Sequence, residues 1–253
     1  MIRSAGLVLV AAILAAVLSV ANLPLAAVAG WAGLHKAGLS YARAEGTLWR
    51  GVLVGARFNG HALGDVTVAA KPAALLAGRA SMSFAMDGDG VLGRGGAAVG
   101  LDRRVRIMDA RFLVDLDRFS YYFSELPFGG AVEADVRSLT FGPRGCEVAD
   151  ARIATDAFKE TAAAMRGEAP VLDGPLRCDG DALLADLAGG ADNDRVALTA
   201  RLGPDLSYAL RLSVRTDDPS VSSLLPMLGF MGEDDQFNYA LDGKLAAARG
   251  VQS

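Results

Sequence analysis

Apolar residues follow two different periods along the chain, and the change near residue 45 separates an N-terminal segment from the rest. No ionisable side chain lies between Arg3 and His35, and the stretch from Leu7 to Ala21 consists almost wholly of Leu, Val, Ile and Ala. A helix rises about 1.5 Å per residue and the hydrocarbon core of a bilayer is about 30 Å thick, so about 20 apolar residues span it. The pattern predicts a single transmembrane helix within residues 1–36.

A cleaved signal peptide is the alternative for this segment. Arg3 supplies the positive charge of a signal peptide, and Ala27-Val28-Ala29 before Gly30 fits the small-x-small cleavage pattern. The apolar stretch is longer than the about 7–15 residues of an ordinary signal sequence, which favours an uncleaved anchor. In both cases residues 37–253 are expected on the far side of the inner membrane of a bacterium-like cell.

After residue 45 apolar and polar residues alternate, which is typical of strands with one buried and one solvated face. Ala80, Met82, Phe84 and Met86, for example, alternate with Arg79, Ser81 and Ser83. On the first strand Leu48, Val52, Val54, Ala56 and Phe58 have the same parity and are expected on one face. The predicted strands cover residues 48–58, 66–70, 80–86, 105–107, 112–116, 132–136, 196–202, 206–214 and 239–245.

Short helices are expected between some of these strands. The predicted helical segments are residues 72–77, opened by proline and closed by glycine, and residues 117–125, 155–165 and 218–228. The spacing favours a long antiparallel meander over βαβ units, and no boundary between two domains is visible. We therefore expect a mainly β fold: an N-terminal transmembrane helix (1–36) followed by one periplasmic antiparallel β domain (37–253), shaped as a curved sheet, half-pipe or open barrel.

Composition excludes several classes of function. The chain has 25 Lys and Arg against 29 Asp and Glu, so it lacks the excess of basic residues that nucleic-acid binding needs. Its two histidines and two cysteines are too few for an ordinary zinc site. Asp87-Gly88-Asp89-Gly90 and Asp192-Asn193-Asp194 do not complete a calcium loop, and turn chemistry explains them better. We expect no metal and no cofactor.

Candidate catalytic residues are equally scarce. His61 follows an Asn59-Gly60 turn with Asp65 nearby, but no Gly-x-Ser-x-Gly elbow accompanies them. A solvent-facing turn histidine is the favoured interpretation, and no catalytic residue is predicted.

The two cysteines have a structural interpretation. Cys146 and Cys178 enclose 31 residues, and in an oxidising periplasm a disulfide between them is predicted. Two buried free thiols are the alternative, and a redox role is unsupported because there is no Cys-x-x-Cys motif.

Three motifs in order make the N-terminal third similar to a known family. The first is Glu45-Gly-Thr-Leu-Trp-Arg-Gly51, the second runs from Asn59 to Val66, and the third from Lys71 to Arg79, after a Leu23-Pro24 pair. Together they resemble protein N of the bacterial type II secretion system. The motif residues are Gly46, Thr47, Leu48, Trp49, Gly51, Gly60, Leu63, Gly64, Pro72, Leu75, Leu76 and Gly78. A tryptophan that is common in the strand after Gly64 is replaced here by Thr67-Val68.

The resemblance implies a single-pass inner-membrane protein whose periplasmic β domain assists the export of folded proteins. It also implies a cysteine pair in the second half, and it brings no catalytic residue. Its expected partners are other secretion components, in the inner-membrane platform or the outer-membrane secretin. The alternative hypothesis is a lipid-binding or lipid-transfer half-pipe, in which the apolar face of the sheet holds acyl chains unless the short helices fill it.

Overall fold

One antiparallel sheet dominates the computed structural model, which describes residues 22–31, 33–58, 60–76, 78–118, 129–159, 170–190, 194–233 and 235–244. Strands follow one another in the sheet almost in chain order, β1-β3-β4 through to β13-β15-β14, and β2 pairs with β3. All the pairings among the described strands are antiparallel, so the predicted mainly β meander is confirmed. The strands are β1 (Leu39–Ser40), β2 (Arg43–Thr47), β3 (Arg50–Phe58), β4 (His61–Ala70), β5 (Arg79–Gly88), β6 (Val91–Gly100), β7 (Val105–Asp115), β8 (Ala131–Gly142), β9 (Gly145–Thr155), β10 (Leu172–Asp179), β11 (Ala182–Gly190), β12 (Asp194–Leu202), β13 (Ser207–Thr216), β14 (Met231–Glu233) and β15 (Gln236–Lys244).

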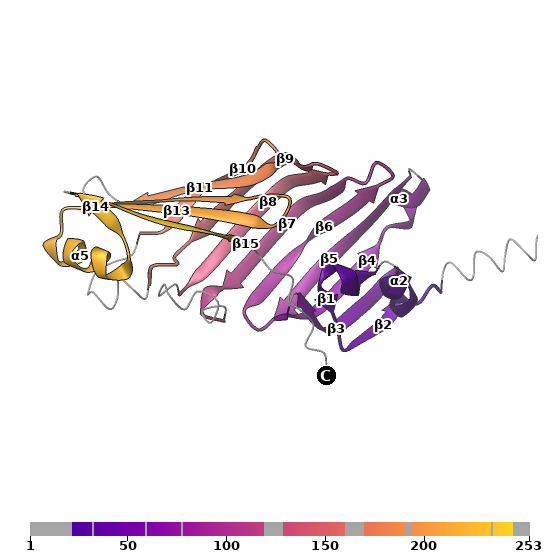
Figure 1. Cartoon of the computed structure of the whole chain (residues 1–253). Helices are drawn as coiled ribbons and strands as arrows, with labels where there is room; N and C mark the ends of the chain where they lie inside the picture. Colours follow the sequence, from indigo (N-terminus) through magenta and orange to yellow (C-terminus); the bar gives the residue numbers. More distant parts are fainter. Residues whose placement is uncertain are drawn as a thin grey trace, which may run out of the picture.

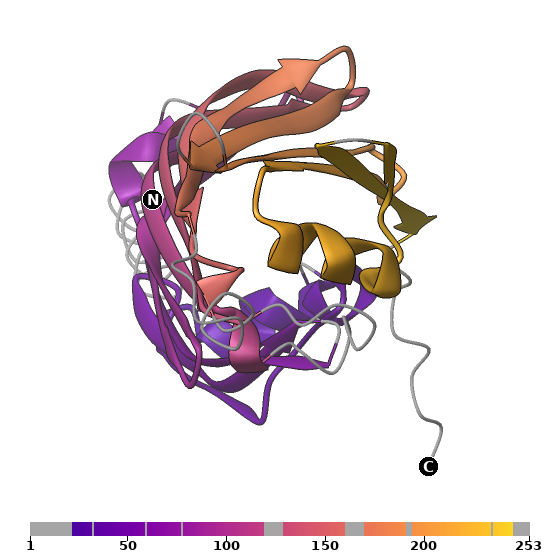
Figure 2. The same ribbon diagram turned by 90° about the vertical axis from the view of Figure 1, so that its left-hand side faces the viewer.

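The sheet curls along its length but does not close (Figures 1 and 2). β1 and β2 follow one another along the outer side of β3, where β1 pairs with its last residues and β2 with its first, and together they form one edge; β14 lies at the other edge. Among the described strands nothing pairs the two edges with each other. The expected curved, open sheet is therefore the one observed.

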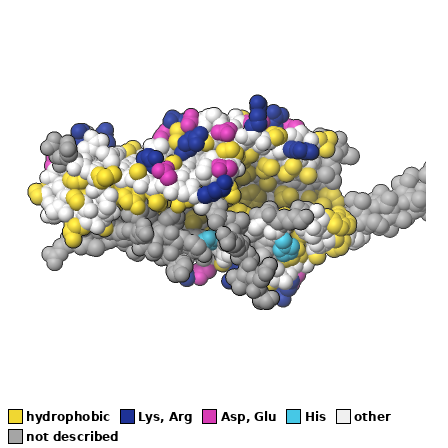
Figure 3. Space-filling view, in the orientation of Figure 1, with side chains coloured by type: hydrophobic (Ala, Val, Ile, Leu, Met, Phe, Trp, Pro, Cys, Tyr) yellow, Lys and Arg dark blue, Asp and Glu magenta, His cyan; other side chains and the backbone are white. Residues whose placement is uncertain are grey.

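The two faces of the sheet differ in chemistry. On the concave face Met82, Ala97, Ile107 and Leu139 lie opposite one another on four successive strands, and Figure 3 shows a hollow lined by hydrophobic side chains. The convex face carries ion pairs between strands, and all but Arg201 (β12) with Asp179 (β10) join immediate neighbours in the sheet. These pairs are Arg111–Asp135, Arg137–Asp150, Arg152–Asp173, Arg177–Asp186, Arg201–Asp179 and Arg211–Asp242.

Buried residues gather in three clusters along the concave face. The largest surrounds Leu172, which is fully buried, together with Val136 and Leu187. A second cluster joins Leu53, Ala56 and Val66 near the first strands, and a third joins Leu212 and Phe237 near the last ones. In most strands the apolar residues that were predicted to share one face are thus the residues on the buried face.

The first predicted strand is an exception. The register of β3 against β4 shifts between Leu53 and Ala56, so these two buried residues of opposite parity reach the same cluster. Such a bulge adds one residue to one strand and reverses which residues face inward. The expectation that Val52, Val54, Ala56 and Phe58 share one face with Leu48 was wrong for this reason.

Short helices close the two ends of the concave face. α2 (Leu25–Trp31) places Leu25 in the cluster with Leu53, Ala56 and Val66. At the other end α5 (Pro219–Leu224) and the 3-10 helix η3 (Leu225–Leu228) bring Leu225 into the cluster with Leu212 and Phe237 (Figure 2). This confirms the helix predicted for residues 218–228, and the Asp218 side chain caps it by accepting from the Ser220 N–H.

The other predicted helices are partly observed. α3 (Pro72–Leu76) has the predicted proline start and glycine end. Thr155, the expected start of another helix, instead ends β9, and residues 160–165 lie outside the described residues. Most of the segment expected at 117–125 lies outside them too.

The N-terminal anchor cannot be placed in the same way, because residues 1–21 lie outside the described part of the chain. None of the helices that the structure describes has the length and apolar character needed to cross a bilayer. The boundary predicted at residue 36 stays a prediction.

Candidate interaction surfaces

A disulfide fixes the two strands at the centre of the largest cluster. Cys146 in β9 and Cys178 in β10 are bonded, with their Cα atoms 5.6 Å apart. Cys146 is buried, and its N–H donates to the Asp181 carbonyl oxygen at 2.8 Å. The predicted disulfide is confirmed, and the alternative of two free thiols was wrong.

The first family motif forms the hairpin between β2 and β3 and its contact with α2. Gly46 has a positive φ of 79°, and a Cβ there would lie 2.5 Å from the Arg50 carbonyl oxygen. A Cβ at Gly51 would lie 2.7 Å from Cδ2 of Leu25. Both glycines therefore permit close packing. Gly46 lets β2 and β3 approach each other, and Gly51 lets α2 pack against the sheet. Thr47 ends β2, and Leu48 and Trp49 connect β2 with β3.

The second motif forms the β3–β4 hairpin. Gly60 and Gly64 have positive φ angles of 89° and 74°. A Cβ at Gly60 would meet nothing within 4 Å, whereas one at Gly64 would overlap the Gly88 Cα on the neighbouring strand. Leu63 packs partly buried against the cluster of Leu53 and Val66.

The third motif covers the connection from β4 to β5. Pro72 opens α3, whose last residues are Leu75 and Leu76, and Gly78 follows with a φ of 68°. The motif residues are thus placed at turns and at one helix–sheet contact. Backbone geometry and close packing account for the glycines of these motifs and for Pro72.

His61 and Asp65, the residues considered for catalysis, both lie on β4. His61 is half-buried at the start of β4, opposite Phe58, so it is less exposed than expected. Asp65 accepts a hydrogen bond from the Gly55 N–H at 2.9 Å and thereby supports the bulge in β3. In the part of the chain that the structure describes, no group of His, Cys, Asp and Glu could hold a metal ion.

An open groove of about 850 Å³ crosses the sheet from β5 to β9. Two rows of paired residues line it, one containing Arg94 and Arg111 and the other Leu92 and Leu113. No serine, cysteine, lysine or histidine is among its lining residues.

The two edges of the sheet are protected to different degrees. Three features protect the first edge: the bulge distorts β3, the Arg43–Glu45 ion pair places charges on β2, and α2 packs against β2. Bulges, charged side chains and covering helices are known ways to prevent unwanted strand pairing. At the second edge β14 pairs only with residues 236–238 of β15, and Met231 is 76% exposed. Met227 of η3 is 80% exposed. This edge combines unpaired strand backbone, within the described residues, with exposed apolar side chains.

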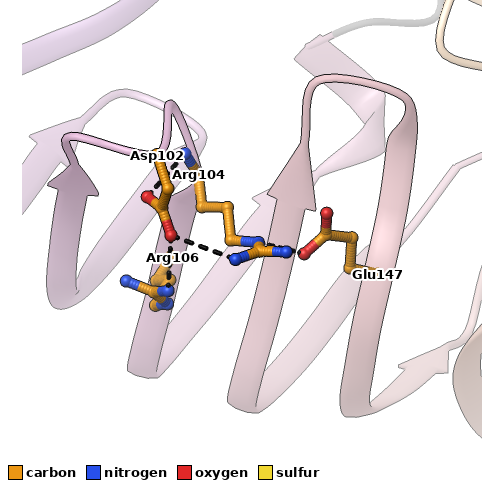
Figure 4. A network of polar contacts seen from close by, with 4 residues as sticks. All are labelled: Asp102, Arg104, Arg106 and Glu147. Carbon is orange, nitrogen blue, oxygen red and sulfur yellow. Dashed lines mark hydrogen bonds and ion pairs between the residues drawn. The ribbon is translucent and has the colours of Figure 1, made fainter.

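A charged network joins the β6–β7 and β8–β9 hairpins at the end of the strands that carries α3 (Figure 4). Arg104 donates to Glu147 at 2.5 Å and to Asp102 at 3.2 Å, and Arg106 donates to Asp102 at 3.3 Å. The backbone N–H of Arg104, followed by its guanidinium and that of Arg106, holds the pKa of Asp102 below its usual value. Glu147 raises the pKa of Arg104, with Asp102 adding to the effect. The network ties the β6–β7 turn to β9.

Comparison with known proteins identifies the class to which this architecture belongs. Residues 37–240 match the family model described as type II secretion system (T2SS), protein N. Searches of curated proteins and of solved structures returned no significant match. The match covers most of the chain, so the protein belongs to the type II secretion system protein N family, as the motifs predicted. The family is an accessory component of secretion and is not known as an enzyme family, and its membership connects this chain with type II secretion and with the cell envelope.

Proposed function

We propose that the chain is a non-enzymatic accessory scaffold of the type II secretion system. In this proposal an N-terminal helix within residues 1–36 anchors it in the inner membrane, and the sheet stands in the periplasm. The expected partners are components of the inner-membrane platform or the outer-membrane secretin.

The observation that carries the proposal is the edge at β14 and β15, which no other described strand covers. A free strand edge offers backbone N–H and C=O groups to an added strand, and nearby apolar side chains bury surface when that strand binds. Met231 and Met227 supply such apolar surface beside the edge. Natural sheets seldom leave an edge in this state unless something covers it.

Photo-crosslinking in secreting cells tests this proposal. A photoreactive residue at Met231 or Ala240 reports on the free edge, and one at Ala197, in the middle of the convex face on β12, is the matched control. We expect adducts to a secretion component from the edge positions and not from Ala197. Equal adducts at all three positions, or none at the edge, would count against a scaffold that docks by its edge.

Lipid binding is the second candidate, and the hydrophobic hollow in Figure 3 favours it. α5 and η3 fill one end of the concave face through Leu225, and α2 fills part of the other through Leu25. Between them, Phe84 and Phe112 stack with ring centroids 6.0 Å apart and are only partly buried. Mass spectrometry of the purified full chain would show copurified phospholipid in this case, and its absence after mild extraction would exclude a stable lipid ligand.

A further inference from the structure

Unpaired basic residues are concentrated at one end of the strands. Of the 21 Lys and Arg with described side chains, 12 form ion pairs within the described part of the chain and nine do not. Five of the nine lie at the end of the strands that carries α3, and we call them the basic rim: Arg50, Lys71, Arg79, Arg103 and Arg144.

Sheet topology places these five residues side by side. Arg50 begins β3, Lys71 follows β4 and Arg79 begins β5. Arg103 lies in the β6–β7 turn and Arg144 in the β8–β9 turn. Neighbouring strands are about 4.8 Å apart, so the rim extends about 30 Å from β3 to β9. Figure 3 shows Lys and Arg side chains along this edge, at the upper right above the hydrophobic hollow.

The charge excess is specific to this end. The network of Figure 4 lies at the same rim, but its two arginines are matched by Asp102 and Glu147. At the opposite ends of the same strands the described charges are mainly acidic. Six aspartates and three basic residues lie there: Asp65, Asp87, Asp89, Asp115, Asp117 and Asp156, with Arg57, Arg118 and Lys159.

Exposed aliphatic side chains lie within the rim. Leu101, in the β6–β7 turn beside Arg103, is 92% exposed, and the paired residues Val99 and Val105 below it are also exposed. Isolated exposed leucines are common, but this one lies near two cations of the rim, Arg103 in the same turn and Arg79 opposite Gly100, and so combines the two features that anionic bilayers bind.

The path of the N-terminal segment leads to the same rim. The Leu48 N–H donates to the Leu23 carbonyl oxygen at 2.9 Å, and Pro24 forms an isolated bridge with Thr47. The chain before Asn22, which contains the uncharged apolar run, therefore joins the domain beside Arg50. A bilayer that holds this run would lie next to the basic rim.

From these observations we infer that the basic rim rests on an anionic phospholipid bilayer, the one in which the N-terminal segment is anchored. The inference rests on the anchor of the proposed function and adds an orientation to it. The rim faces the membrane, and the acidic ends of the strands point away from it.

Lipid-specific fluorescence quenching in proteoliposomes tests the inference. The full chain carries a fluorophore on a third cysteine, at Leu101→Cys in the rim or at Asp89→Cys on the opposite end as the reference. Vesicles contain a headgroup-labelled quencher lipid in phosphatidylcholine, with or without about 30% phosphatidylglycerol to give a negative surface. We expect strong quenching at position 101 only with phosphatidylglycerol, weak quenching at position 89 in both lipids, and loss of the difference in high salt.

Charge variants separate the rim from net charge. Arg103→Gln with Arg144→Gln removes two rim cations, and Arg94→Gln with Arg195→Gln removes two exposed, unpaired cations elsewhere. At about 1 kcal/mol per cation near an anionic surface, the first pair should lower the docking equilibrium constant about thirtyfold, and the second should leave it unchanged.

Several results would overturn the inference. They are equal quenching at positions 101 and 89, equal quenching in neutral and anionic vesicles, and equal losses from the two variant pairs. If any of these results is found while crosslinking from Met231 is intact, the scaffold proposal is retained and the membrane contact of the rim is refuted. Failure of the full chain to float with either vesicle type would refute the anchor and, with it, the inference.

Discussion

Two glycines of the second family motif permit a direct test of why the motif requires glycine. Gly60 and Gly64 both have positive φ, which costs a residue with a Cβ about 1–2 kcal/mol. Only at Gly64 would the Cβ overlap a neighbouring strand, at the Gly88 Cα and the Asp87 carbonyl oxygen. Forcing strands apart in this way adds about 1–3 kcal/mol.

We therefore expect Gly60→Ala to lower the free energy of unfolding by about 1–2 kcal/mol, and Gly64→Ala to lower it by about 2–5 kcal/mol. Urea unfolding of the full chain in mild detergent, followed by circular dichroism of the sheet, measures both values at the same m-value. Gly60→Ala is the matched control because it changes the same residue type in the same hairpin. Equal losses for the two variants would refute the argument that contact with β5, and not backbone conformation alone, requires Gly64.

Three further predictions concern stability and protonation. Replacing both Cys146 and Cys178 by serine should lower the free energy of unfolding by about 4 kcal/mol on the loop-entropy account, and an unchanged urea midpoint would contradict that account. Leu172→Ala, at a fully buried position, should cost about 3–5 kcal/mol, whereas Leu101→Ala should cost less than about 0.5 kcal/mol; similar thermal shifts for both would show that Leu172 is not in a close-packed core. The Ser207 hydroxyl, then Lys244 and the Ser207 N–H, hold the pKa of Asp205 below its usual value. Its contribution to stability should be complete above about pH 4 and lost as the pH falls through the lowered pKa, and Ser207→Ala should raise the midpoint of an NMR titration of this carboxyl; an unchanged midpoint would contradict the assignment.

Alternation of residue types predicted the class of fold because one face of this sheet is apolar and the other polar. Met82, Phe84 and Met86 show this in β5, and Leu198 and Leu212 show it on the paired strands β12 and β13. The short helix after Asp218 was predictable because its cap and proline act locally.

Strands with weak alternation were not predicted. β6 contains Gly93, Gly95, Gly96 and Gly100, so its sequence favours a turn, yet it pairs along its length with β5 and β7. Gly95 permits the close pairing, because a Cβ there would lie 2.4 Å from Cβ and 2.8 Å from Cα of Ala110. β9, β10 and β11 were also missed, although the disulfide between β9 and β10 was predicted from compartment and family.

The candidate surfaces depend on contacts that a linear pattern does not contain. The bulge at Leu53 and Ala56 depends on pairing with β4, so parity alone assigned the wrong face. The basic rim contains residues from Arg50 to Arg144, which become neighbours only when the meander aligns the strand ends. Charge counts along the sequence showed a net acidic chain and gave no sign of this local excess.

The nearly sequential order of the strands also bears on biogenesis. From β3 to β13 each strand pairs with its immediate predecessor, so almost no segment waits for a distant one to be synthesised. Contacts that are local in sequence lower the loop-closure cost and favour rapid folding. A polypeptide that emerges from a translocation pore N-terminus first could thus add hairpin after hairpin to a growing structure, and few unpaired segments would be exposed to proteases while export continues.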